Sequence, residues 1–201
     1  MIAIIDYDAG NLKSVEKACA FLGEEAVITR DRQAILNADQ VILPGVGAFK
    51  DAMEHLKKYD LDSILQTVIE RSIPLLGICL GLQLLFESSE ENPGVKGLGF
   101  LKGKIVKIPA QDNLKIPHIG WNSLHLQHNG RLFADIEEGA HVYFVHSYYL
   151  QAEDEQIVKA VTDYSAQIHA SVEQGNIFAC QFHPEKSGSV GLQILKNFAN
   201  L

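Results

Sequence analysis

A cysteine set between two glycines is the part of this chain best suited to chemistry. Residues 77–81 read Gly-Ile-Cys-Leu-Gly, the apolar run before them is strand-like, and a helical pattern begins at Leu80. Glycines two residues either side of Cys79 suit a strained strand-to-helix turn, because a Cβ there would collide with the turn or with a substrate. A helix N-terminus favours a thiolate and offers the amide of Leu80 to a developing oxyanion. We therefore predict that Cys79 is a nucleophile.

The competing interpretation is a buried cysteine that packs as a small hydrophobic residue, as most free cysteines do. It fits Cys19, which lies in an amphipathic helical pattern, and Cys180, which lies in the strand-like run 177–182. Packing alone does not explain the paired glycines around Cys79. We therefore predict structural roles for Cys19 and Cys180.

A nucleophilic thiol needs a base, and only one of the eight histidines has its own orienting carboxylate. His183, Pro184 and Glu185 follow an apolar strand pattern. Residues two apart on an extended chain share a face, so Glu185 can contact one ring nitrogen of His183 while the other faces the thiol, and Pro184 keeps His183 extended. Together with Cys79 they would supply nucleophile, base and orienting group. Taken alone, a His-Pro-Glu triplet also suits a structural role.

A second glycine-rich turn follows the strand-like run 41–43 and reads Pro44-Gly45-Val46-Gly47. Its glycines would let the backbone amides of Val46 and Gly47 approach a ligand, as an oxyanion hole or a carboxylate site. A phosphate-binding loop fits poorly, because no Gly-Lys-Ser/Thr follows. A purely structural turn remains the alternative interpretation.

Alternating strand and helix patterns predict an α/β fold. We expect strands at 2–6, 26–29, 40–43 and 75–78, and helices at 12–22, 47–73 and 80–87. This alternation is typical of a mostly parallel sheet with helices on both faces. The functional groups should then gather at the carboxyl ends of the strands.

The second half of the chain has a different pattern, which predicts added antiparallel strands. Closely spaced strands are expected at 103–108, 141–150, 157–162 and 168–174. A closing helix is expected at 190–198, with Ser189 as its N-cap. Because no linker or change of composition divides the chain, we expect one domain, 1–201.

Composition narrows the classes of partner and compartment. The 201 residues carry a formal charge of −8 without a Lys/Arg cluster, which argues against binding to nucleic acid or an anionic membrane. Three widely spaced cysteines indicate neither a disulfide framework nor a metal site, so we expect a reduced, cytoplasmic protein. The apolar start, 1–6, is too short for a signal peptide or a membrane-spanning helix and predicts a buried first strand.

The motifs at 44–47, 77–83 and 183–185, in this order and at these separations, resemble the class I glutamine amidotransferase family. The resemblance extends over essentially the whole chain and implies that family's flavodoxin-like fold. Within the family, the segments at 5–12, 117–122, 143–148 and 183–188 are most similar to glutaminase subunits of imidazole glycerol phosphate synthase. Ala9 departs from the commonest form of these segments, in which many relatives carry a bulkier residue, but the site residues are intact.

The resemblance implies a glutaminase that needs no cofactor and no metal. Cys79 would attack the side-chain amide of glutamine, His183 would transfer the protons and Glu185 would hold the imidazole, with glutamate and ammonia as products. The oxyanion hole would comprise Val46, Gly47 and Leu80. The substrate would be bound by Gly47, Gln83, Ser147 and Tyr148. Ser147 as an ordinary strand hydroxyl is the alternative.

The same resemblance implies a partner, a (β/α)8-barrel cyclase subunit that uses the ammonia. That subunit makes imidazole glycerol phosphate and aminoimidazole carboxamide ribotide in histidine biosynthesis. The chain lacks a phosphate loop, so the phosphorylated substrate should bind the partner. We expect the docking face to include Asn11, Trp121, Asn122 and Lys186, with Lys186 near the ammonia exit. A core tryptophan and a solvated lysine are the alternatives.

Three other functions compete with this one. A glutaminase subunit of another enzyme, such as pyridoxal phosphate synthase, would share the chemistry but lacks the context at 120–122 and 183–186. A cysteine peptidase or esterase could use the same triad, although nothing in the sequence marks a peptide groove. A noncatalytic binding module of the same fold would have no need of an intact triad.

Overall fold

The computed structural model describes residues 1–8 and 10–201, so Ala9 lies outside the described residues. Its centre is an eight-stranded sheet in the order β2-β1-β3-β4-β13-β12-β11-β8. Five neighbouring strands are parallel: β2 (Ala26–Thr29), β1 (Ile2–Ile5), β3 (Gln40–Gly45), β4 (Leu75–Cys79) and β13 (Ile177–Cys180). Three are antiparallel: β12 (Ala166–Gln174), β11 (Val158–Tyr164) and β8 (His125–Leu126). The mostly parallel sheet with later antiparallel strands is therefore confirmed.

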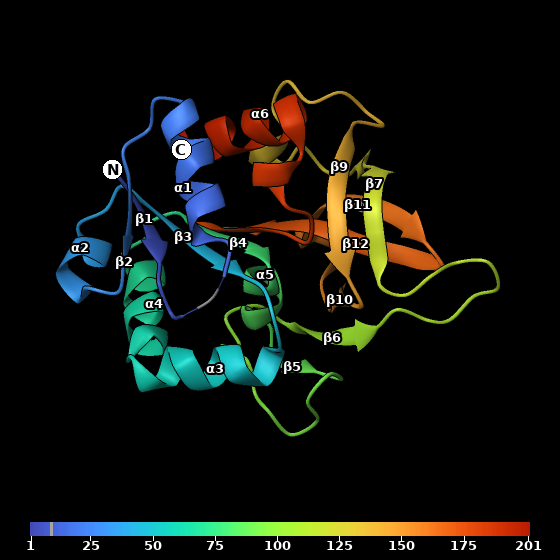
Figure 1. Cartoon of the computed structure of the whole chain (residues 1–201), viewed down its shortest axis with the longest axis horizontal. Coiled ribbons are helices and arrows are strands. Elements are labelled where there is room, and N and C mark those ends of the chain that lie inside the picture. The colour runs from blue at the N-terminus through green and yellow to red at the C-terminus, as the bar shows by residue number, and fades with distance from the viewer. Residues whose placement is uncertain (9) are drawn as a thin grey trace.

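Helices cover both faces of this sheet (Figure 1). On one face lie α1 (Leu12–Phe21) and α6 (Gly188–Ala199), and on the other lie α3 (Phe49–Lys58), α4 (Leu61–Glu70) and α5 (Leu80–Leu84). Side chains alternate along each strand, so Ile4 packs in the core beneath α1 and α6, while Ala3 packs in the core beneath α3 and α4. The short α2 (Arg32–Leu36), which the sequence patterns did not predict, contacts α4.

Two small sheets extend the molecule beyond the antiparallel strands. One contains β10 (Tyr148–Ala152), β6 (Gly103–Lys107) and β5 (Ser88–Ser89), and the other pairs β7 (His118–Ser123) with β9 (His141–His146). Short 3-10 helices lie at Arg131–Phe133, Glu155–Ile157 and Pro184–Lys186. In the part of the chain that is described, no helix combines the length and apolar character that crossing a membrane requires.

Several expected element boundaries are wrong. The single helix expected at 47–73 is α3 and α4, because Asp60 adopts a left-handed conformation between them, with φ 55°. The strand expected at 141–150 is divided at Ser147 into β9 and β10, which belong to different sheets. The helix expected at 80–87 ends at Leu84. The closing helix begins at Gly188 with Ser187, rather than Ser189, at its N-cap position.

The sheet order places the two catalytic candidates side by side. β13 runs parallel to β4, with Cys180 opposite Ile78. The residues that follow these strands therefore leave the same edge of the sheet. Cys79 ends β4 and His183 follows β13, so this register brings a thiol and an imidazole to one place although they are far apart in sequence.

Candidate active site

Cys79 occupies the predicted strand-to-helix turn. Its backbone, with φ 55° and ψ −107°, lies in a region that non-glycine residues rarely adopt. A Cβ at Gly81 would lie 1.9 Å from the carbonyl oxygen of Leu43, and one at Gly77 would lie 2.8 Å from the carbonyl oxygen of Gly81. Both glycines are therefore needed for the turn to pack against itself and against β3.

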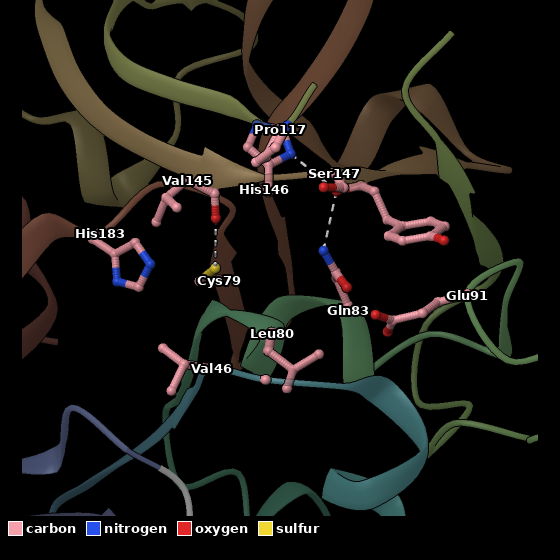
Figure 2. A pocket seen from close by; sticks show the side chains of 12 residues that line it. Val46, Cys79, Leu80, Gln83, Glu91, Pro117, Val145, His146, Ser147 and His183 are labelled. Carbon is pink, nitrogen blue, oxygen red and sulfur yellow. Dashed lines mark hydrogen bonds between the residues drawn. The ribbon is translucent and has the colours of Figure 1, made fainter. Parts of the chain in front are cut away.

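His183 and Glu185 form a buried pair beside the thiol. His183 Nδ1 and Glu185 Oε1 are 2.7 Å apart, and the two side chains are 1% and 0% exposed. Figure 2 shows the imidazole of His183 next to Cys79. Burial alone would lower the pKa of His183, but the contacts with Cys79 and Glu185 outweigh it and raise the pKa to about 9. The imidazole therefore holds a proton at neutral pH and favours a thiolate beside it.

The position of His183 is fixed by Tyr143 on β9 and by Ser187, which precedes α6. Its backbone N–H donates to the carbonyl of Tyr143 at 2.9 Å. The hydroxyl of Ser187 donates to the carbonyl of His183 at 2.6 Å and accepts the N–H of Tyr143 at 2.9 Å. The Ser187 hydroxyl thus ties the imidazole segment to β9, which is why it does not cap α6 with its side chain.

Asn11, a half-buried residue expected on the docking face, contacts the carboxylate of the pair. Its side-chain amide donates to Glu185 Oε1, the same oxygen that accepts from His183. The other oxygen, Glu185 Oε2, is buried without a hydrogen bond from the described residues. Asn11 therefore links the loop after β1 to the orienting carboxylate.

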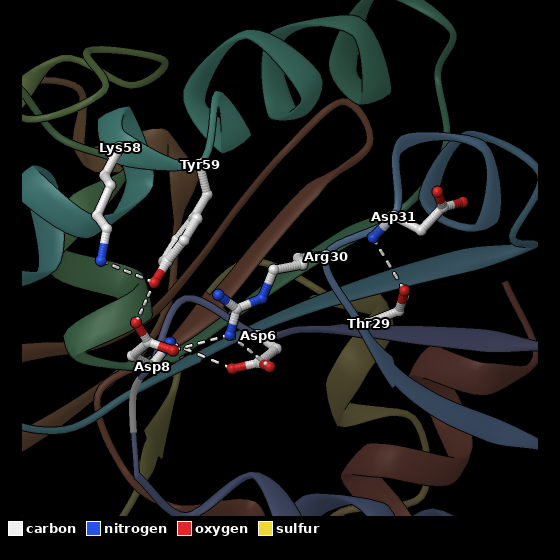
Figure 3. Close-up of polar contacts among 7 residues, drawn as sticks. All are labelled: Asp6, Asp8, Thr29, Arg30, Asp31, Lys58 and Tyr59. Atoms are coloured by element: carbon white, nitrogen blue, oxygen red, sulfur yellow. Dashed lines mark hydrogen bonds and ion pairs between the residues drawn. The ribbon is translucent and has the colours of Figure 1, made fainter.

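An ion cluster anchors the start of that loop (Figure 3). Arg30 donates to Asp6 at 2.7 Å and to Asp8 at 2.8 Å, and its guanidinium lies 4.1 Å from the ring centroid of Tyr59. The hydroxyl of Tyr59 donates to Asp8, and this bond together with Arg30 lowers the pKa of the Asp8 carboxyl. The cluster connects the carboxyl ends of β1 and β2 to the end of α3.

A pocket of about 330 Å³ opens beside Cys79. Its lining includes every oxyanion and substrate residue that the sequence predicted: Val46, Gly47, Leu80, Gln83, Ser147 and Tyr148. Gly47 has φ +100°, which glycine adopts without strain. Behind the glycine-rich turn, the buried hydroxyl of Tyr7 donates to the carbonyl of Pro44 at 2.8 Å. The structure thus gathers at one cavity the predicted groups of three separate motifs.

The pocket also contains Glu91, which the sequence analysis missed. Its carboxylate accepts the backbone N–H of Phe49 at 2.8 Å, at the start of α3. Figure 2 shows Glu91 and Gln83 on the side of the pocket away from His183. Glu91 lies in a polar run, Ser88 to Asn92, that matches no motif. The one sequence signal for it is its position shortly after Cys79 and the helix that follows.

Two buried histidines, His118 and His146, contact each other beside the pocket, where β9 ends and β10 begins. His118 Nδ1 lies 3.0 Å from His146 Nε2, and His146 Nδ1 lies 2.9 Å from the carbonyl oxygen of Tyr148. Because that carbonyl only accepts, His146 carries its proton on Nδ1. Burial lowers the pKa of His118 to about 4 and that of His146 to about 3, so both imidazoles stay neutral. No sequence pattern predicted this pair.

Two of the expected docking residues are exposed and lie near each other. Trp121 on β7 is 56% exposed, so the alternative of a core tryptophan is wrong. Its ring packs edge-on against Tyr143, with 6.2 Å between the ring centroids, and Lys186 Nζ lies 6.0 Å from the Tyr143 centroid. The half-buried Asn122 donates to the backbone carbonyl of Asp163 at 3.1 Å.

The other two cysteines are structural, as predicted. Cys19 is 2% exposed in α1 and Cys180 is 0% exposed in β13. Burial raises the pKa of Cys19 to about 11 and raises the pKa of Cys180 well above its ordinary value. Neither thiol is suited to act as a nucleophile.

The chain is similar to known proteins over nearly its whole length. The family model described as glutamine amidotransferase class-I matches residues 3–201. The imidazole glycerol phosphate synthase subunit HisH of Bacillus cereus (strain G9842) is 53% identical over 198 residues, which cover 98% of this chain and 93% of the relative. The protein of the same name from Moorella thermoacetica is 50% identical over 200 residues, covering 100% of this chain and 94% of the relative.

Solved structures of low sequence identity share the fold. A crystal structure described as a glutamine amidotransferase aligns with a TM-score of 0.77 at 18% identity, covering 100% of this chain and 98% of the other. The structure of PurLQS from Thermotoga maritima aligns with a TM-score of 0.73 at 20% identity, covering 99% of this chain and 97% of the other. At these identities the likeness concerns the fold alone.

Proposed function

Since the chain belongs to the class I glutamine amidotransferase family, we propose that it is the glutaminase subunit of imidazole glycerol phosphate synthase. It hydrolyses glutamine and passes the ammonia to a (β/α)8-barrel cyclase subunit in histidine biosynthesis. The observation that carries the proposal is a pocket in which Cys79 and a buried His183–Glu185 pair meet, in a chain similar over nearly its whole length to subunits of that enzyme. We further propose that residues 1–201 act as one domain in the cytoplasm.

The first half of the reaction breaks the amide bond of glutamine. The Cys79 thiolate forms a bond to the side-chain carboxamide carbon, and the carboxamide oxygen becomes an oxyanion at the amides of Val46, Gly47 and Leu80. When the tetrahedral intermediate collapses, the carbon–nitrogen bond breaks. His183 gives its Nε2 proton to the leaving nitrogen, which departs as ammonia.

The second half restores the thiolate. His183, now neutral, takes a proton from a water molecule whose oxygen attacks the thioester carbon. The carbon–sulfur bond breaks, its electron pair returns to Cys79, and glutamate leaves. Glu185 stabilises the imidazolium at both stages, and Asn11 holds that carboxylate in place.

The far side of the pocket suits the amino-acid end of glutamine. Both hydrogens of the Gln83 amide nitrogen are engaged, one by the carbonyl of Tyr148 and one by Gln181 Oε1, each at 3.1 Å. Gln83 therefore has only its oxygen left to offer, which suits an ammonium group, as does the carboxylate of Glu91. We propose that these two residues bind the α-ammonium and that the backbone of Ser147 and Tyr148 binds the α-carboxylate.

Glu91→Gln should weaken glutamine binding with little effect on the chemical step. A neutral amide cannot pair with an ammonium, and a hydrogen bond to a charged group contributes about 1.5–3 kcal/mol, so KM should rise at least about tenfold while kcat stays within about twofold. Steady-state kinetics measure both. Glu90→Gln is the matched control, because the Glu90 carboxylate accepts the backbone N–H of Lys107 outside the pocket. The KM of the Glu90→Gln variant should be unchanged. An unchanged KM in Glu91→Gln would remove Glu91 from the substrate site.

The proposed function is tested by glutamine hydrolysis with and without the cyclase and its ribotide ligand. We expect slow hydrolysis by the chain alone and stimulation of about a hundredfold in the liganded complex. A factor of this size corresponds to the gain of one hydrogen-bond donor to the oxyanion. Equal rates in all conditions would contradict the coupling to this partner. Hydrolysis of peptides or esters in preference to glutamine would instead support a peptidase or esterase.

The glycine-rich turn is the expected control point of that stimulation. Gly47 sits at φ +100°, and a β-branched residue there is strained even though no atom lies within 4 Å of the added Cβ. Gly47→Val should therefore suppress the stimulated rate more than the affinity for the cyclase. For the same variant, a binding titration with the cyclase measures the affinity, and glutamine hydrolysis by the liganded complex measures the stimulated rate.

A further inference from the structure

A buried glutamine contacts the sulfur of Cys79 from the side of the sheet. Gln181 follows β13 directly and is 0% exposed. Its Nε2 lies 3.7 Å from Cys79 Sγ, within hydrogen-bond distance for sulfur, and its Oε1 accepts from Gln83 Nε2 at 3.1 Å. The mechanism proposed above makes no use of this side chain.

The carbonyl of Tyr148 fixes which end of the Gln181 amide faces the sulfur. A backbone carbonyl only accepts hydrogen bonds, so the group of Gln83 that lies 3.1 Å from it must be the NH2 group. The second hydrogen of that NH2 group goes to Gln181, whose oxygen must therefore face Gln83. Consequently the NH2 group of Gln181 faces the sulfur as a donor.

The imidazole of His183 faces the same sulfur but gives up its proton during the cycle, so a donor that does not titrate adds to it. The carbonyl oxygen of Val145 lies 4.0 Å from Cys79 Sγ, and it accepts from a thiol but repels a thiolate. The helix that begins after Cys79 has only five residues, Leu80–Leu84, so its dipole is small. In a buried site, a hydrogen bond to an ionised sulfur is stronger than in water.

We propose that Gln181 is a further catalytic residue, which donates an N–H to the sulfur of Cys79 whenever that sulfur carries negative charge. The proposal rests on the glutaminase function proposed above. The donor acts twice in the cycle: on the thiolate before it attacks, and on the sulfur as the carbon–sulfur bond of the thioester breaks and the electron pair returns to it. Gln83 and Tyr148 are positioning residues for this amide.

The test measures the ionisation of Cys79 apart from glutamine turnover. Gln181→Met keeps the length of the side chain, removes the donor, and leaves Gln83 with Tyr148 as acceptor. The rate of alkylation by iodoacetamide is followed against pH, and mass spectrometry of peptides separates Cys79 from the other two cysteines. We expect the midpoint of Cys79 alkylation to rise by about one pH unit, kcat to fall about tenfold, and KM to stay within about twofold.

A matched control separates this effect from the loss of any buried hydrogen bond. The buried hydroxyl of Ser171 donates to the carbonyl of Ala179 at 2.8 Å, and Ser171 does not line the pocket beside Cys79. Ser171→Ala should leave the alkylation midpoint unchanged in protein that melts cooperatively. A second isosteric variant, Gln181→Glu, places an acceptor beside the sulfur and should raise the midpoint at least as far as Gln181→Met.

The outcomes distinguish the two proposals. An unchanged alkylation midpoint in either folded Gln181 variant, or the same rise in Ser171→Ala, would overturn the role of Gln181 while leaving the glutaminase function intact. Wild-type chain that hydrolyses no glutamine with its cyclase would refute the function, whereas the alkylation midpoints would still report whether Gln181 acts on the sulfur.

Discussion

Cys79→Ser should abolish glutamine hydrolysis, lowering kcat at least about a thousandfold. A hydroxyl is far less nucleophilic than a thiolate at neutral pH, and it does not ionise beside the imidazole of His183 as a thiol can. The substitution keeps the Cβ and nearly the same volume, so the strained turn and the surface for the partner should persist. Glutamate release by the complex measures the loss.

Ammonia separates a missing nucleophile from a damaged complex. The Cys79→Ser complex supplied with ammonium salt should make imidazole glycerol phosphate at nearly the wild-type rate, because the cyclase is untouched. Cys19→Ser is the control, since Cys19 is buried in α1 and its hydroxyl replacement can bond the preceding helical turn. Synthesis from glutamine at a near-normal rate in Cys79→Ser would show that another group is the nucleophile.

Local patterns predicted most of the elements around this site because each depends on neighbours in sequence. The paired glycines around Cys79 predicted the turn, since the clashes they avoid are with the turn itself and with the adjacent strand. The pairing of β13 with β4, which brings His183 to the thiol, could not be read from the sequence. It joins Ile177 to Leu75, which are far apart in sequence, whereas the neighbour of β13 on its other side, β12, precedes it directly in a tight hairpin.

The features that sequence reasoning missed arise from tertiary contacts. The break at Ser147 lets β9 and β10 join different sheets, although the residues on either side have continuous strand character. Glu91 gains a role because its loop folds over the start of α3, where the N–H of Phe49 holds its carboxylate. The amide of Asn11 contacts Glu185 across 174 positions of sequence, a role that the sequence did not predict for it. Hydrophobic periodicity depends on residues close together in sequence, so it does not predict such contacts.

His183→Ala should cost about a thousandfold in kcat, because it removes both the thiolate partner and the acid that protonates ammonia. Glu185→Gln should cost less. Only Oε1 of Glu185 is used, by His183 and Asn11, so a glutamine with its oxygen in that place keeps both hydrogen bonds. What it loses is the negative charge that helps to raise the pKa of His183.

The sign of the pH effect in Glu185→Gln follows from that loss. His183 is protonated below its pKa, so a fall from about 9 toward the ordinary value removes the imidazolium at a lower pH. The alkaline limb of kcat/KM should therefore move to lower pH in the variant. A limb that stays in place would mean that the Glu185 carboxylate does not act through His183.

The double variant decides whether the pair acts as one unit. Once His183 is absent, Glu185 has no imidazolium to stabilise, so His183→Ala/Glu185→Gln should be no slower than His183→Ala alone. Fully additive losses would show that the carboxylate acts on the reaction by a route other than the imidazole. The buried contact of 2.7 Å between the two side chains, with both nearly inaccessible to solvent, is the physical reason to expect complete coupling instead.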